Sequence, residues 1–227
     1  MKFGILLSGC GVYDGAEIHE ATMTMLAIQE LGHEYQCISI NKNQHHVVNH
    51  LNGEEINQSR NMMEEAARIA RGNVVEISDV SPSDIDALVI PGGFGSAKNF
   101  SKWAFLGPEG EIDSAVKLLI VNMVNVGKPV CALCVSPVVV AKALEGSSIQ
   151  AKMTLGSDQE ASPYDIQGFN GGIEAVGAKA EMKTIREVLV DTENKIVSAP
   201  CYMMDANILE IRNNVRQAIE ATIELAV

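Results

Sequence analysis

The stretch Lys128-Pro-Val-Cys-Ala-Leu-Cys134-Val-Ser-Pro137 decides the fold. Its apolar residues 130–133 predict a short strand that is covered on both faces, as strands of parallel sheets are. Pro137 suits the first turn of a helix, where its missing N–H group needs no partner. Cys134 therefore falls at a sharp turn between a buried strand and a helix.

Cys134 has the local surroundings of a nucleophile at a strand-to-helix elbow. Ala132 and Ser136, two residues before and after it, are small, as an elbow requires because strand and helix pass close together. A thiolate at a helix N-terminus is stabilised by the helix dipole and free N–H groups. Buried structural thiols are also common, so the local pattern leaves both interpretations open.

Strands and helices alternate over the rest of the chain. A strand at 3–7, a glycine-rich loop, a helix at 16–31 and a strand at 35–40 form a βαβ unit, which predicts a parallel sheet. The later expected elements are helix 61–72, strands 74–77 and 87–90, helices 113–126 and 137–144, strand 149–155, a loop-rich region at 156–177, a hairpin of strands 187–191 and 196–199, and a closing helix 205–227. We expect one α/β domain over residues 1–227.

The composition limits the partners and the compartment. The charge of −12 disfavours nucleic acid and anionic membrane surfaces, and no stretch approaches the ~20 apolar residues of a membrane span. Five cysteines, an odd number, do not form a disulfide framework and indicate a reducing environment. The N-terminus enters an apolar strand directly, without a cleavage site. We therefore expect a cytoplasmic protein.

Two patterns that resemble cofactor sites match poorly. The first loop has Gly9, Gly11 and Gly15, but a dinucleotide fingerprint needs its third glycine one residue earlier. Three histidines at 45–50 have no cysteine or carboxylate at an established ligand spacing, which favours a solvated insertion loop or hairpin. We expect no metal and no cofactor.

A second glycine-rich loop, 91–98, follows the predicted strand at 87–90. Ligands of parallel sheets bind outside the carboxyl ends of the strands, where this loop lies. Gly92 and Gly93 let the backbone approach a ligand closely, with N–H groups directed at an oxyanion. A plain glycine turn is the alternative, and the elbow at Cys134, one βα unit later, argues against it.

A reactive thiol also needs a group that sets its protonation. Glu17 and Glu20 are three residues apart and share one face of the first helix. If the first strand neighbours the elbow strand, this face overlooks Cys134, and a desolvated carboxyl there would have a raised pKa and could donate a proton. The alternative for both acids is favourable pairing with the helix dipole at the surface.

Five motifs together resemble the ElbB-like family of isoprenoid biosynthesis proteins, which have a class I glutamine amidotransferase-like domain and belong to the wider PfpI-like superfamily. The motifs are Leu7-Ser-Gly-Cys-Gly-Val-Tyr-Asp-Gly-Ala-Glu-Ile-His-Glu20, Ile90-Pro-Gly-Gly-Phe-Gly-Ser-Ala-Lys-Asn99, Cys134-Val-Ser-Pro137, Thr154-Leu-Gly-Ser-Asp158 and Pro200-Cys-Tyr-Met203. The resemblance spans essentially the whole chain in the same order. It implies a flavodoxin-like three-layer sandwich with the cysteine at a nucleophile elbow.

Carried over residue by residue, the resemblance makes Cys134 the nucleophile and Glu20 the acid beside the thiol, with Glu17 as the second choice. Gly93 and Val135 match the two backbone N–H donors that face the nucleophile, and the elbow geometry predicts the same two donors. Many superfamily members have histidine where this chain has Val135, and glutaminase domains have a downstream histidine that is absent here. A complete amidotransferase or protease triad is therefore not expected.

The resemblance implies a weak, cofactor-independent glyoxalase that converts glyoxal to glycolate, with a small aldehyde as substrate. A thiolate adds to the aldehyde, backbone N–H groups hold the oxyanion, and a carboxyl such as Glu20 moves the proton through an enediol. The alternatives are a cysteine-based redox sensor or metabolite-binding protein, and a glutaminase domain for a partner synthase. Homodimers are common in the superfamily, so we expect a homodimer.

Three further residues are weaker candidates. His19 adjoins Glu20, but neighbouring helical residues point about 100° apart, so both cannot face the thiol squarely. Cys131 forms a C-x-x-C pair with Cys134, yet it falls inside the predicted strand and is expected in the core. Cys10 lies in the first loop, at the same sheet edge as the elbow, and is a candidate resolving thiol.

Overall fold

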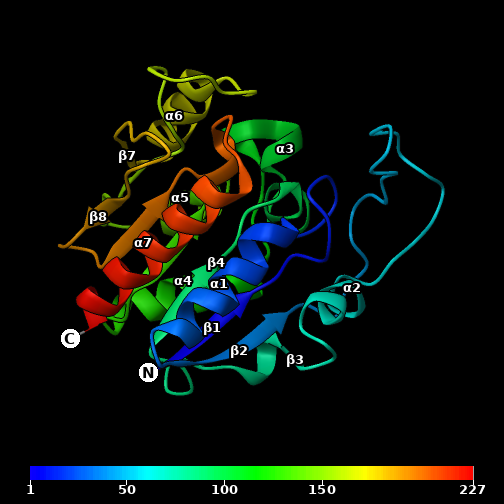
Figure 1. The fold of residues 1–227 in the computed structure, drawn as a ribbon, viewed down its shortest axis with the longest axis horizontal. Coiled ribbons are helices and arrows are strands. Elements are labelled where there is room, and N and C mark those ends of the chain that lie inside the picture. The colour runs from blue at the N-terminus through cyan, green and yellow to red at the C-terminus, as the bar shows by residue number, and fades with distance from the viewer. Residues whose placement is uncertain (227) are drawn as a thin grey trace.

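A seven-stranded sheet between two layers of helices forms the body of the protein, in a computed structural model that describes residues 1–226 (Figure 1). In spatial order the strands are β3 (Val74–Glu76), β2 (Glu34–Ser39), β1 (Lys2–Leu6), β4 (Ala87–Ile90), β5 (Val130–Leu133), β9 (Ile196–Ala199) and β8 (Leu189–Asp191). All neighbours are parallel except β8 and β9, which form the expected antiparallel hairpin. The flavodoxin-like three-layer fold is confirmed.

The central strands of the sheet are fully buried. Every residue of β4, β5 and β9 is buried, because helices cover both faces of these strands. Continuous apolar sequence is what strands in that position require, and it explains why the run at 130–133 could be recognised as a strand. Cys131 is fully buried within β5, as expected.

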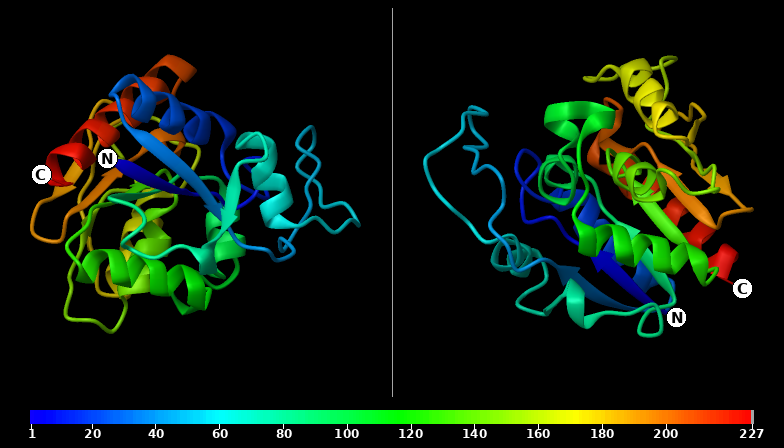
Figure 2. Two further views of the ribbon diagram at one scale, coloured as in Figure 1. Left: turned by 90° about the horizontal axis from the view of Figure 1, so that it is seen from below. Right: turned by 180° about the vertical axis from the view of Figure 1, so that it is seen from behind.

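The helices form two layers. Helices α1 (Ile18–Glu30) and α7 (Ile208–Ala226) pack against each other on one face, and α4 (Ser114–Asn125) and α5 (Pro137–Leu144) pack against each other on the opposite face (Figure 2). The short α2 (Met62–Ile69) lies beside the β2–β3 edge. The predicted closing helix begins at Ile208, and its last predicted residue, Val227, lies outside the described residues.

The expected strand at 149–155 was wrong in length and in sheet. Only Lys152–Met153 (β6) is a strand, and it pairs with β7 (Lys179–Ala180) in a separate two-stranded sheet. The N–H group of Lys152 bonds the Asp191 side chain at 2.8 Å, so a carboxylate replaces the backbone carbonyl that a sheet neighbour would offer. The segment therefore runs beside the β8–β9 hairpin without joining its ladder.

The region expected to be loop-rich at 156–177 contains a helix, α6 (Ile166–Ala175). The glycines of this segment led us to expect a loop, because glycine weakens helices. Asp165 caps its first turn by accepting a hydrogen bond from the N–H group of Gly168 at 3.0 Å. Gly172 leaves room for the ring of Trp103, in the short helix α3 (Trp103–Leu106), because a Cβ at residue 172 would lie 2.8 Å from that ring.

The segment between β2 and α2 is the insertion loop that its polarity predicts, and it extends to one side of the molecule (Figure 1). Isolated bridges between Val48 and Glu55 and between Asn43 and Asn61 hold its two arms together. Within residues 1–226 no group of three or more histidine, cysteine or acidic side chains is placed to hold a metal ion. Over the same residues no helix has the length and apolarity to cross a membrane.

Candidate active site

Cys134 occupies a strained turn at the carboxyl edge of the sheet. It directly follows β5, and its φ of +57° lies in the left-handed region that non-glycine residues rarely adopt. Ser136 holds the turn in place, because its hydroxyl donates to the carbonyl of Pro91 at 2.7 Å and contacts the hydroxyl of Ser96 at 3.0 Å. The elbow is thereby fixed to the glycine-rich loop that follows β4.

Glu20, in the first turn of α1, faces the thiol of Cys134. Its side chain is fully buried and accepts hydrogen bonds from the N–H groups of Gly92 at 2.8 Å and Tyr202 at 3.3 Å. The carboxyl and the thiol are close enough to share a hydrogen bond. The condition that β1 neighbours β5 is not met, because β4 lies between them, yet α1 still reaches the elbow across the end of β4.

Gly92 and Gly93 let the loop after β4 pack closely against its neighbours at the thiol, each for a different reason. A Cβ at residue 92 would lie 2.4 Å from the Cβ of Cys134 and 2.6 Å from a carboxyl oxygen of Glu20, so only a hydrogen atom fits there. Gly93 has a φ of +90°, and a Cβ at residue 93 would lie 2.3 Å from the carbonyl oxygen of Gly15. The two loops consequently pack backbone against backbone beside the thiol.

Burial determines the protonation states of Glu20 and Cys134. Desolvation, followed by the charge of Glu17, raises the pKa of Glu20 to about 8. Desolvation and the charge of Glu20 raise the pKa of the Cys134 thiol well above its ordinary value, and the N–H groups of Gly93 and Val135, directed at the sulfur, offset only part of this rise. The thiol is therefore protonated at neutral pH, and the expected thiolate stabilisation at the helix N-terminus is outweighed by burial.

Glu17 and His19 lie beside this pair but do not face the thiol. Glu17 is the N-cap of α1, where its carboxylate accepts from the N–H group of Glu20 at 2.7 Å, and burial raises its pKa. His19 points toward the surface, with Nδ1 2.8 Å from the hydroxyl of Tyr202 and 4.0 Å from Glu17. Glu20 is thus the acid that the fold brings to Cys134.

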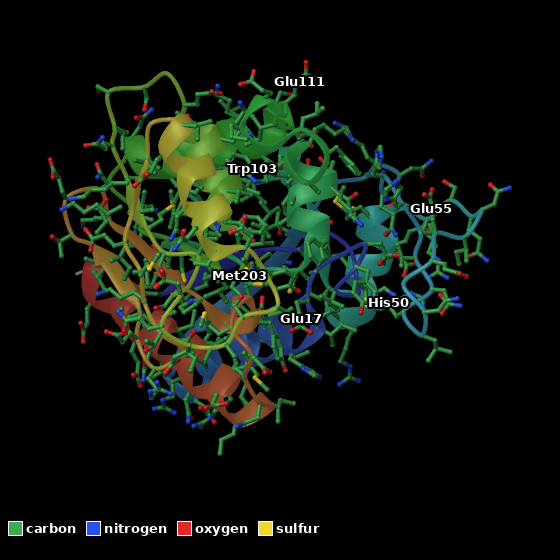
Figure 3. All side chains as sticks on the ribbon, turned by 90° about the horizontal axis from the view of Figure 1, so that it is seen from above. Glu17, His50, Glu55, Trp103, Glu111 and Met203 are labelled. Carbon is green, nitrogen blue, oxygen red and sulfur yellow. The ribbon has the colours of Figure 1, made fainter. Side chains whose placement is uncertain are left out.

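A narrow hollow of about 20 Å³ lies over Cys134, and Met203, labelled in Figure 3, is one of its lining residues. It has room for roughly one water molecule. Its walls are mostly apolar and aromatic, from Val12, Phe94, Tyr164, Phe169, Tyr202 and Met203. Burial raises the pKa of Tyr164 to about 12, with smaller contributions from the charges of Cys134 and Glu20, so its hydroxyl stays a donor.

None of these wall residues was proposed from the sequence as a site residue, although Val12, Phe94, Tyr202 and Met203 lie within the motifs that carry the family resemblance. Tyr202 and Met203 lie shortly after β9, behind Pro200 and Cys201, and β9 neighbours β5 in the sheet, so their place at the carboxyl end of a central strand was the available signal. Tyr164 and Phe169 come from the region around α6, which carried no signal for this site.

Comparison with known proteins agrees with this architecture. The DJ-1/PfpI family model matches residues 10–156, more than half of the chain and including most of the first loop, Glu20 and the elbow. The chain belongs to the DJ-1/PfpI family. The human protein named glutamine amidotransferase-like class 1 domain-containing protein 3, mitochondrial, is 35% identical over 226 residues, which cover 99% of this chain and 83% of the relative.

Two solved structures resemble this DJ-1/PfpI protein over nearly its whole length. An isoprenoid biosynthesis protein with an amidotransferase-like domain from Ehrlichia chaffeensis covers 99% of both chains with a TM-score of 0.89 and 32% identity. Glyoxalase III from Candida albicans covers 97% of both chains with a TM-score of 0.60 and 18% identity, so that likeness shows a common fold.

The relatives' names correct the expected compartment. The human relative and the ES1 proteins of rat and zebrafish are all named mitochondrial, which contradicts the expectation of a cytoplasmic protein. The reasoning failed because reduced cysteines exclude only oxidising compartments and do not distinguish one reducing compartment from another.

The other cysteines of this DJ-1/PfpI chain differ in their relation to Cys134. Cys10 is partly exposed and does not line the hollow over Cys134. Burial raises its pKa, and the charges that shift this pKa further belong to Glu65 and Arg68 of α2 and to Asp14 and Arg60. Cys201, which lies in the Pro200–Met203 motif but was not proposed as a site residue, is fully buried just after β9, next to the elbow strand.

Proposed function

We propose that the protein is a cofactor-independent glyoxalase that converts glyoxal and similar small α-oxoaldehydes to hydroxy acids through an adduct on Cys134. The observation that carries this proposal is the buried Glu20 carboxyl facing the Cys134 thiol, with a pKa of about 8. A group with that pKa exchanges its proton readily near neutral pH, as general acid–base catalysis requires.

The first step forms the adduct. The Glu20 carboxylate takes the thiol proton as sulfur bonds to one aldehyde carbon, and the C=O π electrons move to oxygen. The N–H groups of Gly93 and Val135, which point at the sulfur, are placed to hold this oxyanion next to it. Protonation of the oxyanion by Glu20 gives a hemithioacetal and restores the carboxylate.

The second step moves a proton between the two carbons. The Glu20 carboxylate removes the hydrogen from the carbon bonded to sulfur, and the electron pair moves to the neighbouring carbonyl oxygen, which gives an enediolate. The hydroxyl proton passes from the first oxygen to the second, and Glu20 returns its proton to the neighbouring carbon, which gives a glycolyl thioester. Water then cleaves the C–S bond, releases glycolate and restores the thiol. One aldehyde carbon is oxidised while the other is reduced, so the reaction needs no external oxidant or reductant.

The hollow over Cys134 supports a small, uncharged substrate. It is narrow and its walls are mostly apolar and aromatic, which disfavours a large or ionic substrate. The high pKa of Cys134 counts against a peroxide sensor, since the thiolate is the form that oxidants attack. Among residues 1–226 no histidine lines this hollow, which counts against a glutaminase.

The test is incubation of the purified protein with glyoxal, without glutathione, while NMR follows glycolate. Wild type should form glycolate, and Cys134→Ala should lose at least about 100-fold in rate. Cys10→Ser is the matched control, because it alters a cysteine that does not line the hollow, and it should keep the wild-type rate. Equal rates in wild type and Cys134→Ala would overturn the proposal.

A further inference from the structure

The first loop of the chain contains a tight turn that forms part of the wall around Cys134. The N–H group of Gly15 bonds the carbonyl of Gly11 at 2.7 Å and closes the turn. Its tip consists of Val12, Tyr13 and Asp14. Val12 lines the hollow over the thiol, and its carbonyl accepts a hydrogen bond at 2.7 Å from the N–H group of Phe94, another wall residue. The shape of the hollow therefore depends on where this turn is held.

The segment after β4 holds two carbonyl groups of the tip. The ammonium of Lys98 donates to the carbonyl of Tyr13 at 2.8 Å. The side-chain amide of Asn99 donates to the carbonyl of Asp14 at 2.9 Å. These bonds leave the N–H group of Tyr13 and the carboxylate of Asp14 for other partners.

The insertion loop between β2 and α2 supplies those partners. The N–H group of Val48 donates to the buried carboxylate of Asp14 at 2.7 Å. His50, labelled in Figure 3, accepts a hydrogen bond through Nε2 from the N–H group of Tyr13 at 3.2 Å. The rings of His50 and Tyr13 also pack together, with their centroids 5.0 Å apart. The insertion loop thus contacts both tip residues that follow Val12.

The hydrogen bonds of His50 require one tautomer. Nδ1 lies 3.0 Å from the carbonyl oxygen of Val48, which can only accept, so Nδ1 carries the hydrogen. Nε2 is then free of hydrogen and presents its lone pair to the N–H group of Tyr13. Gly11 makes room for the ring, because a Cβ at residue 11 would lie 2.5 Å from Nε2. The imidazole therefore fits closely against the turn.

The other two histidines of the insertion loop lie elsewhere. The rings of His45 and His46 pack against Phe105, with centroid distances of 4.4 and 5.4 Å. Nε2 of His46 lies 3.6 Å from the carboxylate of Glu55. Among residues 1–226 neither side chain has a hydrogen bond to the turn. His46 is consequently a matched control for His50.

We propose that His50 is a positioning residue for the site at Cys134. By binding the N–H group of Tyr13 it holds Val12 in the wall of the hollow and so restricts bulky reactants from the thiol. Loss of this bond would loosen the tip of the turn and widen the hollow. Selection among aldehydes rests on the proposed glyoxalase function, whereas control of access to the thiol does not.

The test compares alkylation of Cys134 by iodoacetamide and by the larger iodoacetanilide at pH 9, with peptide mapping to identify the modified residue. His50→Asn keeps an amide N–H group near Val48 but does not reach Tyr13, so it should raise the ratio of the large-reagent to the small-reagent rate by at least about fivefold. His50→Gln places an amide oxygen near the position of Nε2 and should stay within about twofold of wild type. Val12→Ala should raise the ratio as His50→Asn does.

His46→Asn should keep the wild-type ratio. A wild-type ratio in His50→Asn or in Val12→Ala would overturn the proposal. So would an equal rise in His46→Asn, or a rise in His50→Gln as large as in His50→Asn. Thermal melts check that each variant is folded.

The ratio of kcat/KM for phenylglyoxal to that for glyoxal should follow the same order among these variants. A different order would overturn the selection among aldehydes alone. If wild type forms no glycolate, the glyoxalase proposal fails, and the alkylation ratios still decide whether His50 controls access to Cys134.

Discussion

Glu20 and Cys134 come from different layers of the molecule, the helix α1 and the β5–α5 elbow, and they meet beside the backbone of Gly92. The N–H group of Gly92 bonds the carboxylate, and the missing side chain of Gly92 leaves the space in which the carboxyl and the thiol face each other. Each group is buried, and the charge of Glu20 raises the pKa of the Cys134 thiol. The pair therefore acts as one proton-holding unit.

Gly92→Ala should disrupt this unit. The added methyl group would lie 2.4 Å from the Cβ of Cys134, so the elbow or α1 must shift. We expect a loss of about 1–3 kcal/mol in the free energy of unfolding. Glyoxal turnover should fall by at least about 100-fold, because a misplacement of roughly 1 Å in an active site reduces the rate by about that factor. Chemical denaturation and NMR of glycolate measure the two effects.

The matched control is Gly171→Ala. Gly171 is an exposed helical residue of α6, and nothing lies within 4 Å of the position its Cβ would take. Alanine there should keep turnover and stabilise the protein by about 0.5–1 kcal/mol. Full turnover in Gly92→Ala would show that close contact at residue 92 is not needed.

Stability should fall as the pH rises from about 5 to about 8. The pKa of Glu20 is raised from its ordinary value of 4.5 to about 8 in the folded protein. Over this range the folded state keeps a proton that the unfolded state releases, so the folded state is favoured at the acid end and loses that advantage toward pH 8. The slope from one such group is at most about 1.4 kcal/mol per pH unit.

Glu20→Gln should remove most of this slope, because glutamine does not titrate. Glu17, whose pKa burial also raises, should supply what remains. Melting temperatures of wild type and Glu20→Gln at several pH values between 5 and 8.5 measure the difference. Parallel curves for the two proteins would mean that Glu20 has no raised pKa.

His19→Ala should have little effect on turnover. The imidazole bonds the hydroxyl of Tyr202 at the surface, so its removal should cost about 0.5–1.5 kcal/mol of stability and change the rate by less than about twofold. Steady-state kinetics and thermal melts check both values. A large loss of rate with an unchanged melting temperature would instead assign His19 a role in proton transfer.

Cys134 should react slowly with peroxide at neutral pH. Burial and the charge of Glu20 keep the thiol protonated, and only the thiolate reacts readily. The extent of oxidation after a brief exposure should increase with pH and still be rising at about pH 9, as intact-mass measurement with peptide mapping would show. Rapid oxidation of Cys134 at pH 7 would favour the redox sensor over the glyoxalase.

The sequence predicts the centre of the fold well because parallel strands buried on both faces need unbroken apolar runs. Residues 130–133 have such a run, and the small residues around Cys134 indicate the elbow. The pairing of Glu20 with Cys134 followed from the family resemblance, since helical periodicity alone did not separate it from Glu17.

The outer parts of the site could not be predicted, since they depend on long-range packing. Tyr164 reaches the hollow from the segment before α6, whose three glycines suggest a loop. The protonation of Cys134 also depends on burial, which local pattern does not give. A helix N-terminus suggested a thiolate, whereas the surrounding side chains keep the group neutral.

The most direct test of the Glu20–Cys134 pair is the pH dependence of kcat/KM for glyoxal in wild type and Glu20→Gln. Since the carboxylate must accept the thiol proton, the wild-type value should rise with pH and level off above an apparent pKa near 8. Glu20→Gln should be at least about 100-fold slower near pH 8 and lack that rise. A Glu20→Gln profile that matches wild type in rate and shape would contradict the account.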